Sequence, residues 1–118
     1  MSTVLYLFNL QPGVTPADYE HWAEAIDLPR LRHLPSVRDY RILRADPSPL
    51  ATSPRYVEIL DLTSPVQFRR DMTAPPLAAV AATFAHFAAA PTVLTCTELG
   101  TTSAHDRART DTNGEQQL

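Results

Sequence analysis

The sequence predicts one α+β domain in which a strand, helix and strand unit occurs twice, giving the order βαββαβ and a four-stranded antiparallel sheet. Three observations support this prediction. The chain has 118 residues, 44% of them apolar, which suffices for one hydrophobic core and not for two. Four apolar segments have the length of strands. Two helices that begin at prolines lie between these strands, and their capping residues match.

The first unit begins with an apolar segment from Thr3 to Leu10, whose β-branched and aromatic residues are typical of a strand. After a proline-glycine turn, Thr15 is placed to cap an amphipathic helix that Pro16 begins. Pro29 and Pro35 disfavour helical angles at Leu28 and Leu34, the residues that precede them, so we expect at most a short helical turn in the segment between. The alternating segment from Val37 to Arg44 predicts the second strand.

The second unit repeats the first. After a strand predicted from Arg55 to Leu62, the segment Ser64-Pro65-Val66-Gln67-Phe68 matches Thr15-Pro16-Ala17-Asp18-Tyr19 as cap, proline, spacer, capping partner and aromatic residue. Pro75-Pro76 interrupts the second helix, which then restarts, and the last strand is predicted from Thr92 to Leu99. This duplication indicates the ferredoxin-like arrangement. We assign residues 1–100 to the domain and the polar residues 101–118 to a disordered tail.

The composition argues against several classes of function. A formal net charge of -3 without a basic run disfavours nucleic acid and membrane surfaces as partners. The chain has no lysine to form a Schiff base, and its three scattered glycines leave no nucleotide-binding loop. No histidine, cysteine or carboxylate pair has metal-site spacing, so we expect neither metal nor cofactor. No segment has the length of a membrane span, and Cys96 is the single cysteine, so we expect a cytoplasmic protein.

Both faces of the predicted sheet are apolar. The first strand, for example, carries Leu5, Tyr6, Leu7 and Phe8 at consecutive positions, and these side chains alternate between the two faces. Helices cover only one face of such a sheet, so the other face needs a separate cover. We expect a homodimer in which two sheets pack together, with a small-molecule pocket between each sheet and its own helices.

Over residues 3–99 the chain resembles the dimeric α/β barrel superfamily. The segment Asp27-Leu28-Pro29-Arg30-Leu31-Arg32-His33-Leu34-Pro35-Ser36 resembles the end of the first helix in EthD-like proteins, which usually have histidine in place of Asp27. The segment Arg70-Asp71-Met72-Thr73-Ala74-Pro75, continuing to Phe87, is similar to the RedY-like (HapK-like) proteins of prodigiosin-type pathways, which the chain resembles most.

The resemblance implies a cofactor-independent tailoring enzyme of secondary metabolism. It implies proton transfer on an aromatic, pyrrole or indole intermediate, as in a cyclase, an isomerase or a dehydratase. Two alternatives stay open at the level of sequence. One is a cofactor-free monooxygenase of quinol-type substrates, and the other is a non-catalytic module that binds a reactive intermediate.

Three ionisable residues are candidates for catalysis. Asp27 lies at the end of the first helix, where the helix dipole disfavours a carboxylate, so it either acts as a base or caps the following turn. Glu58 interrupts an apolar strand, so it is either catalytic or paired with an arginine of the second strand. His33 is either a second proton carrier or a surface histidine.

Four aromatic residues are candidates for stacking on a planar substrate, although buried aromatic residues at such spacing more often belong to the core. Trp22 and Tyr40 are preferred because each ring has a polar edge. Tyr6 and Phe8 follow from their place in the first strand. The remaining binding candidates are Asp71 and Met72, through the family resemblance alone, and His86, which is alternatively a surface residue.

Overall fold

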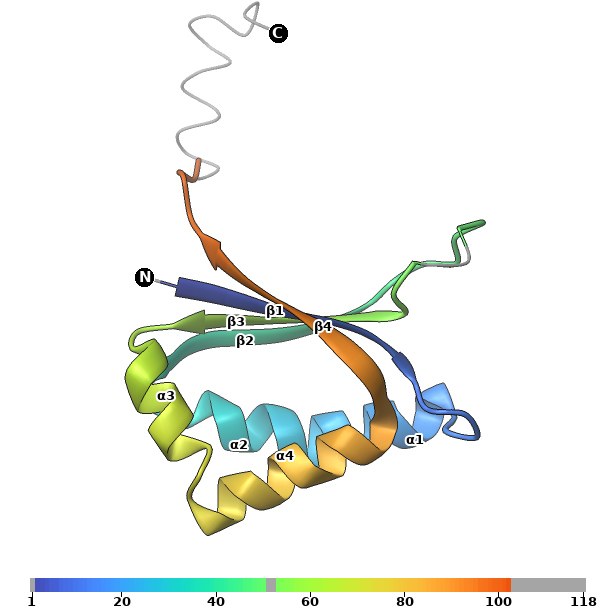
Figure 1. Ribbon diagram of the computed structural model, residues 1–118, viewed down its shortest axis with the longest axis horizontal. Coiled ribbons are helices and arrows are strands. Elements are labelled where there is room, and N and C mark those ends of the chain that lie inside the picture. The colour runs from blue at the N-terminus through green and yellow to red at the C-terminus, as the bar shows by residue number, and fades with distance from the viewer. Residues whose placement is uncertain (1, 51–52, 103–118) are drawn as a thin grey trace, which may run out of the picture.

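The computed structural model describes residues 2–50 and 53–102. The four strands form one antiparallel sheet in the order β2-β3-β1-β4, and all the helices lie on one side of it (Figure 1). This is the ferredoxin-like βαββαβ arrangement that the sequence predicts. The predicted tail falls on residues 101–118, of which residues 103–118 lie outside the described part. The strands are β1 Ser2–Leu10, β2 Val37–Arg44, β3 Tyr56–Leu62 and β4 Ala88–Thr97.

The helical part of the first unit consists of three segments that follow one another without a gap. They are α1 Pro16–Trp22, the π-helix η1 Ala23–Asp27 and α2 Leu28–Arg32. The expected short helical turn is present as α2, whereas the expectation that Pro29 moves Leu28 away from helical angles is wrong. Leu28 keeps helical angles (φ -58, ψ -50), and its amide donates to the carbonyl of Ala23, five residues earlier. Pro29 is tolerated because it falls in the first turn of α2, where its missing amide hydrogen is not required.

The helical part of the second unit consists of α3 Pro65–Asp71 and α4 Pro75–Phe87. The separation of these two helices confirms the predicted break at Pro75-Pro76. The predicted caps are also confirmed. Thr15 Oγ1 accepts a hydrogen bond from the amide of Asp18, and Ser64 Oγ accepts one from the amide of Gln67, both at 3.1 Å. The two units thus begin their helices in the same way.

The last strand begins earlier than predicted. β4 follows α4 directly at Ala88, whereas the sequence pattern predicted a start at Thr92. Pairing of Ala88 and Ala89 with Leu10 and Asn9 of β1 holds this alanine-rich segment extended, although alanine favours helices. The register shifts between Leu7 and Asn9, and Ala90 near this bulge has a positive φ of 36.

The core fills the space between the sheet and the helices in two clusters. Tyr6, Trp22 and Ile42 are partly buried and pack against both. Within the described residues, no helix has the length and apolar character that crossing a membrane would require. The buried members of the first cluster are Leu31, Val37, Tyr40, Leu60, Leu62, Phe68, Leu77 and Val80, and those of the second are Phe8, Tyr19, Ala23, Tyr56 and Ala88.

The opposite face of the sheet, here named the open face, is not covered by any helix of the described residues (Figure 1). Its apolar side chains pair across the strands, with Leu5 opposite Ile59 and Leu7 opposite Val57, and all four are half-buried. Leu94 lies opposite Leu5 on β4 and is 46% exposed. The open face is therefore a continuous apolar strip across three strands.

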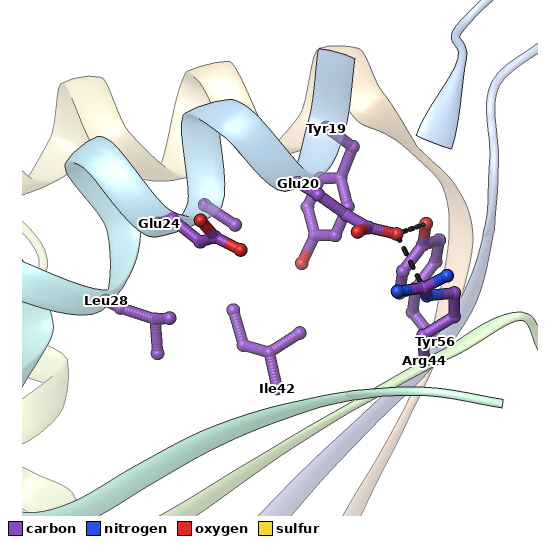
Figure 2. Close-up of a pocket in the computed structure, with 8 residues that line it drawn as sticks. Tyr19, Glu20, Glu24, Leu28, Ile42, Arg44 and Tyr56 are labelled. Atoms are coloured by element: carbon purple, nitrogen blue, oxygen red, sulfur yellow. Dashed lines mark hydrogen bonds and ion pairs between the residues drawn. The ribbon is translucent and has the colours of Figure 1, made fainter. Parts of the chain in front are cut away.

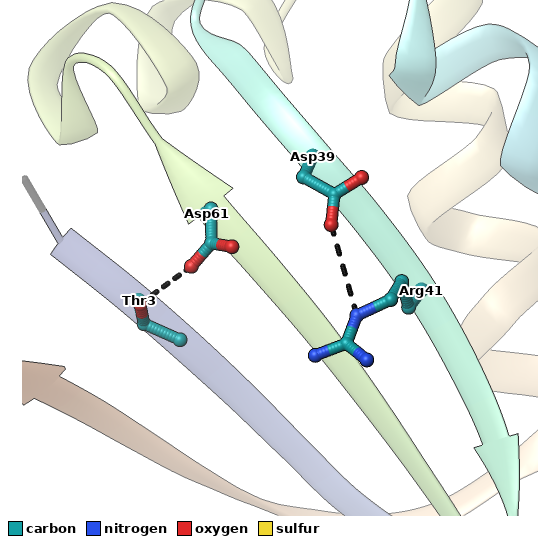
Figure 3. A network of polar contacts seen from close by, with 4 residues as sticks. All are labelled: Thr3, Asp39, Arg41 and Asp61. Carbon is teal, nitrogen blue, oxygen red and sulfur yellow. Dashed lines mark hydrogen bonds and ion pairs between the residues drawn. The ribbon is translucent and has the colours of Figure 1, made fainter. Parts of the chain in front are cut away.

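One end of the open face is polar. Thr3 Oγ1 donates a hydrogen bond of 2.6 Å to Asp61, and Arg41 lies 3.7 Å from Asp39 in an exposed ion pair (Figure 3). Such an exposed pair contributes little to stability in water. The open face is therefore polar at one end and apolar along the strip of leucine, isoleucine and valine side chains.

Candidate functional site

A cavity of about 500 Å³ lies between the sheet and the helices, where the sequence predicts a pocket. Its volume lies in the range of small-molecule sites. The sheet contributes Tyr6, Tyr40, Glu58 and Leu60 to its wall. The helices and their connections contribute Asp27, Leu31, Phe68, Arg69, Met72, Thr73, Val80, Ala81 and Phe84.

Asp27 is positioned by the π-turn and is almost completely buried, with 3% of its surface exposed. It makes no capping hydrogen bond to the backbone, so the alternative role as a helix cap is wrong. Its Oδ2 instead accepts a hydrogen bond of 2.8 Å from the hydroxyl of Tyr40 on β2. The π-turn therefore directs a carboxylate toward the sheet, and such turns are frequent at functional sites.

Glu58 lies in the middle of β3 and is 4% exposed. The expected arginine partner is wrong, because the residue opposite Glu58 on β2 is Ile42, and Arg44 pairs instead with Glu20 at 3.2 Å. Glu58 Oε2 accepts a hydrogen bond of 2.8 Å from the hydroxyl of Tyr19 on α1. A neutral hydroxyl does not neutralise a carboxylate, so the cost of burying the ionised form persists.

Burial raises the pKa of both carboxyl groups. The pKa of Asp27 rises to about 6, against the effect of the hydrogen bond from Tyr40. The pKa of Glu58 rises to about 8 through burial and then through the nearby charge of Asp27, against the hydrogen bonds from Tyr19 and Tyr40. Both carboxyl groups therefore hold a proton more readily than exposed carboxyl groups do, and both face the same cavity.

Burial also raises the pKa of Tyr19 and of Tyr40 far above its usual value. Both hydroxyls consequently keep their protons across the whole working range of pH. They act as hydrogen-bond donors that hold the two carboxylates in place, and they do not act as bases.

Five of the ten predicted site residues line the cavity. They comprise the two acids, two tyrosines of the sheet and one methionine that directly follows α3. The hydroxyl of Tyr40 touches Asp27, whereas Met72 supplies apolar surface. These five residues are Tyr6, Asp27, Tyr40, Glu58 and Met72.

The other five do not line it. Phe8 is 2% exposed and stacks on Tyr56, with ring centroids 5.6 Å apart. Trp22 packs against Phe87 at 5.2 Å, because helical spacing directs it into the second core cluster. Asp71 accepts hydrogen bonds of 2.7 Å from Ser36 and Gln67, and two histidines are exposed, His33 and His86.

Tyr19 is the functional residue that the sequence pattern missed. A signal was present, because Tyr19 and Phe68 occupy the same position in the two repeated units and only Tyr19 carries a hydroxyl. The structure uses both, since Phe68 lines the cavity and Tyr19 holds Glu58. Arg69 was also missed, because the two arginines in the last turn of this helix, Arg69 and Arg70, have the pattern of ordinary solvated residues.

A second, smaller pocket of about 180 Å³ is lined by Tyr19 and by residues of α1 and β2 (Figure 2). Glu20 lines it and accepts a hydrogen bond of 2.7 Å from the hydroxyl of Tyr56, beside its ion pair with Arg44. Its most prominent charged groups are thus paired with each other. The larger cavity, with its two buried acids, is therefore the candidate site.

Metal binding finds no support in the described part of the chain. Within residues 2–50 and 53–102, no group of three histidine, cysteine or carboxylate residues is arranged to hold an ion. The chemistry of the site must then be considered from its carboxylates, its tyrosines and its apolar wall.

Comparison with protein families identifies the chain. The family model of the REDY-like protein HapK matches residues 2–99. The chain belongs to the HapK family. HapK from Hahella chejuensis has a similar solved structure, with a TM-score of 0.73 and 25% sequence identity over 88% of this chain and 98% of that chain. The resemblance to RedY-like proteins is thereby confirmed.

More distant solved structures share the fold. A dimeric ferredoxin-like protein of unknown function from Thermobifida fusca has a TM-score of 0.64 and 23% identity, over 82% of this chain and 90% of that chain. SnoaB, a cofactor-independent oxygenase from Streptomyces nogalater, has a TM-score of 0.67 and 20% identity, over 85% and 94%. An EthD family protein from Bacillus halodurans has a TM-score of 0.63 and 21% identity, over 84% and 99%. The comparison with curated protein sequences yields no match.

Proposed function

We propose that this protein is a cofactor-independent enzyme that moves protons on an aromatic, pyrrole or indole intermediate, as a cyclase, an isomerase or a dehydratase. One observation carries the proposal. Two buried carboxyl groups, each held by a tyrosine hydroxyl, face a cavity whose other walls are mainly apolar. A charge that is expensive to bury and is nevertheless kept at a cavity is a sign of function.

The apolar wall suits a flat ring. Leu60 contributes from the sheet, and Phe68, Val80 and Phe84 contribute from the helices on the other side. A planar substrate between them gains from burial of its two faces and from contact with the aromatic rings. The reacting edge of the ring then points to the acids, since they are the polar part of the interior wall.

The acid pair is suited to transfer one proton in each direction. The ionised carboxylate takes a proton from a carbon or heteroatom of the substrate, and the protonated carboxyl gives one back at another atom. In a dehydration, the donated proton leaves with the hydroxyl group as water, and no oxidant is consumed. The raised pKa values of both acids match this use near neutral pH.

We also infer that a second copy of the chain covers the open face. The half-buried side chains of Leu5, Leu7, Val57 and Ile59 support this, because they would otherwise leave an apolar strip in water. The similar protein from Thermobifida fusca is described as dimeric. The proposed dimer packs sheet against sheet and leaves the cavity of each protomer under its own helices.

The test uses Asp27→Asn, with Glu24→Gln as a matched control from the same π-turn. Glu24 is exposed and lies outside the cavity. Hydroxylated aromatic, pyrrole and indole compounds are first screened for binding by thermal shift, and turnover of the bound compounds is followed by NMR. We expect Asp27→Asn to lower kcat at least about 100-fold, the usual contribution of a general acid or base, while binding persists. Full turnover by a folded Asp27→Asn protein would reject the proton role.

Two other outcomes correspond to other functions. Consumption of one oxygen molecule per turnover would favour a cofactor-free monooxygenase, the activity given for the similar protein SnoaB. In that case the carboxylate only deprotonates the substrate, whose carbanion then reduces oxygen. Stoichiometric binding without turnover in any variant would favour a module that sequesters a reactive intermediate.

A further inference from the structure

Arg69 gives the cavity a charge at one place on its wall. Within the described residues that line the cavity, it is the one cation, and the acids are Asp27 and Glu58. The acids are almost completely buried, whereas Arg69 is exposed. The cavity therefore has a buried acidic part and a cationic rim.

The Arg69 guanidinium is available to a ligand. Within residues 2–50 and 53–102, it makes no ion pair, and the arginines that do so there include Arg41 and Arg44. The nearest acid along the chain, Asp71, is occupied by hydrogen bonds from Ser36 and Gln67. No neighbouring carboxylate of this region thus competes for Arg69.

The two charged parts lie apart along the sheet. Arg69 belongs to α3, which follows the end of β3 at the edge of the domain (Figure 1). Glu58 lies four residues before Leu62, where β3 ends, which corresponds to about 13 Å at the usual rise of a strand. Leu60 and Phe68 line the same cavity, and in the chain Leu60 follows Glu58 by two residues on β3 while Phe68 directly precedes Arg69 on α3.

We propose that the cavity binds an aromatic acid, with the substrate carboxylate on Arg69 and the reacting edge on Asp27 and Glu58. This proposal rests on the proposed function, whose substrate class it narrows. The planar guanidinium matches a carboxylate with two parallel hydrogen bonds. The negative charge of the acid pair repels the same carboxylate, so the two ends of the cavity select one orientation of the ligand.

The test compares each acid with its neutral amide. The probes are indole-2-carboxylate, pyrrole-2-carboxylate and benzoate, each paired with its carboxamide, and Kd is measured by isothermal titration calorimetry at pH 7.5. We expect the wild-type protein to bind at least one acid about 10-fold more tightly than its amide, as for a charged hydrogen-bonded pair. Arg69→Gln should abolish this preference. The Kd of the acid should rise, while the Kd of the amide should stay within about 2-fold of its wild-type value.

Arg70→Gln is the matched control. Arg70 is the next residue of α3, is exposed and does not line the cavity, so its loss changes the net charge by the same amount. The preference for the acid should persist in Arg70→Gln and be partly restored in Arg69→Lys. Circular dichroism and thermal melting verify that each variant is folded.

Three results would overturn the inference. These are the absence of an acid preference in all three probe pairs, its persistence in Arg69→Gln, and its equal loss in Arg70→Gln. The experiment is independent of turnover. If Asp27→Asn keeps full activity while the acid preference depends on Arg69, the proton mechanism is rejected and the carboxylate-binding site is retained. If Asp27→Asn loses activity while the acid preference does not depend on Arg69, the binding site is rejected and the proton mechanism is retained.

Discussion

The two faces of the sheet differ in where their carboxylates and their apolar side chains lie. On the face under the helices, Glu58 is buried and hydrogen-bonded to a side chain 39 positions away, and the wall around it is apolar. On the open face, Asp61 of the same strand is half-buried and accepts a hydrogen bond from Thr3, and the apolar side chains of this face are also only half-buried (Figure 3). The helices of the chain cover the first face, whereas the open face has no helix of the described residues packed on it.

This contrast separates two reasons for an unfavourable residue. A buried carboxylate weakens the fold, so its retention points to chemistry. An exposed apolar strip does not weaken the isolated fold, so its retention points to association. The following predictions test each side of this distinction, beginning with the largest expected effect.

A charge in the middle of the open face should abolish the proposed dimer. Ile59→Glu places an unpaired carboxylate in the expected interface, where leaving a charge without a partner costs about 3–5 kcal/mol. We expect the dimer Kd to rise at least about 100-fold, measured by analytical ultracentrifugation. Val66→Glu is the control, because Val66 is 52% exposed on α3, and it should leave the dimer intact. A wild-type protein that sediments as a monomer at high concentration would contradict the dimer.

Removal of the buried acid should stabilise the protein at high pH. The folded chain holds a proton on Glu58 up to about pH 8, whereas the unfolded chain releases it near the ordinary value of 4.5. Between these values the folded state binds more protons, so the free energy of unfolding falls as pH rises. Glu58→Gln avoids this loss and should be more stable than wild type at pH 9 by a few kcal/mol. The upper limit is about 5 kcal/mol, because the pKa interval from 4.5 to 8 counts at about 1.4 kcal/mol per pKa unit.

Urea denaturation at pH 5 and at pH 9 measures this difference. Asp61→Asn is the control from the open face, because Asp61 is a carboxylate of the same strand that is only half-buried and does not line the cavity. It should retain the wild-type dependence on pH. Equal destabilisation of Glu58→Gln at both pH values would show that Glu58 is needed for the fold and does not strain it.

The helix caps should give the smallest effects, and equal ones. Thr15→Ala and Ser64→Ala each remove one side-chain acceptor from a helix start, which costs about 1 kcal/mol. Neither change touches a face of the sheet, so the dimer Kd and the pH dependence of stability should stay as in the wild type. Thermal melting at one protein concentration compares the two variants directly. A much larger effect at one cap would show that the two units are not equivalent in stability.

Local signals predicted most of the fold. The caps at Thr15 and Ser64, the break at Pro75 and the bounds of β2 follow from hydrogen bonds and dihedral preferences within a few residues. The π-turn and the start of β4 were not predicted. At Leu28 and at Ala88, contacts with other elements outweighed the local preference of the chain.

The candidate site was predicted by its acids and not by their surroundings. Asp27 and Glu58 stand out in the sequence because charged residues at apolar positions are costly. The partner of each acid could not be read from the sequence, since Tyr40 and Tyr19 lie 13 and 39 positions away. Trp22 illustrates the same limit, because its chemistry resembles that of Tyr40 and its position directs it away from the cavity.

The sequence by itself determined the repeated unit, the element order, the two unfavourable carboxylates and an apolar surface too large for one layer of helices. Only the tertiary structure decided which hydroxyl holds which acid, and that Arg69 lines the same cavity as the two acids. The physical reason is that capping and periodicity act over a few residues. The pairing of buried polar groups depends instead on how helices and strands that are distant in the chain pack together.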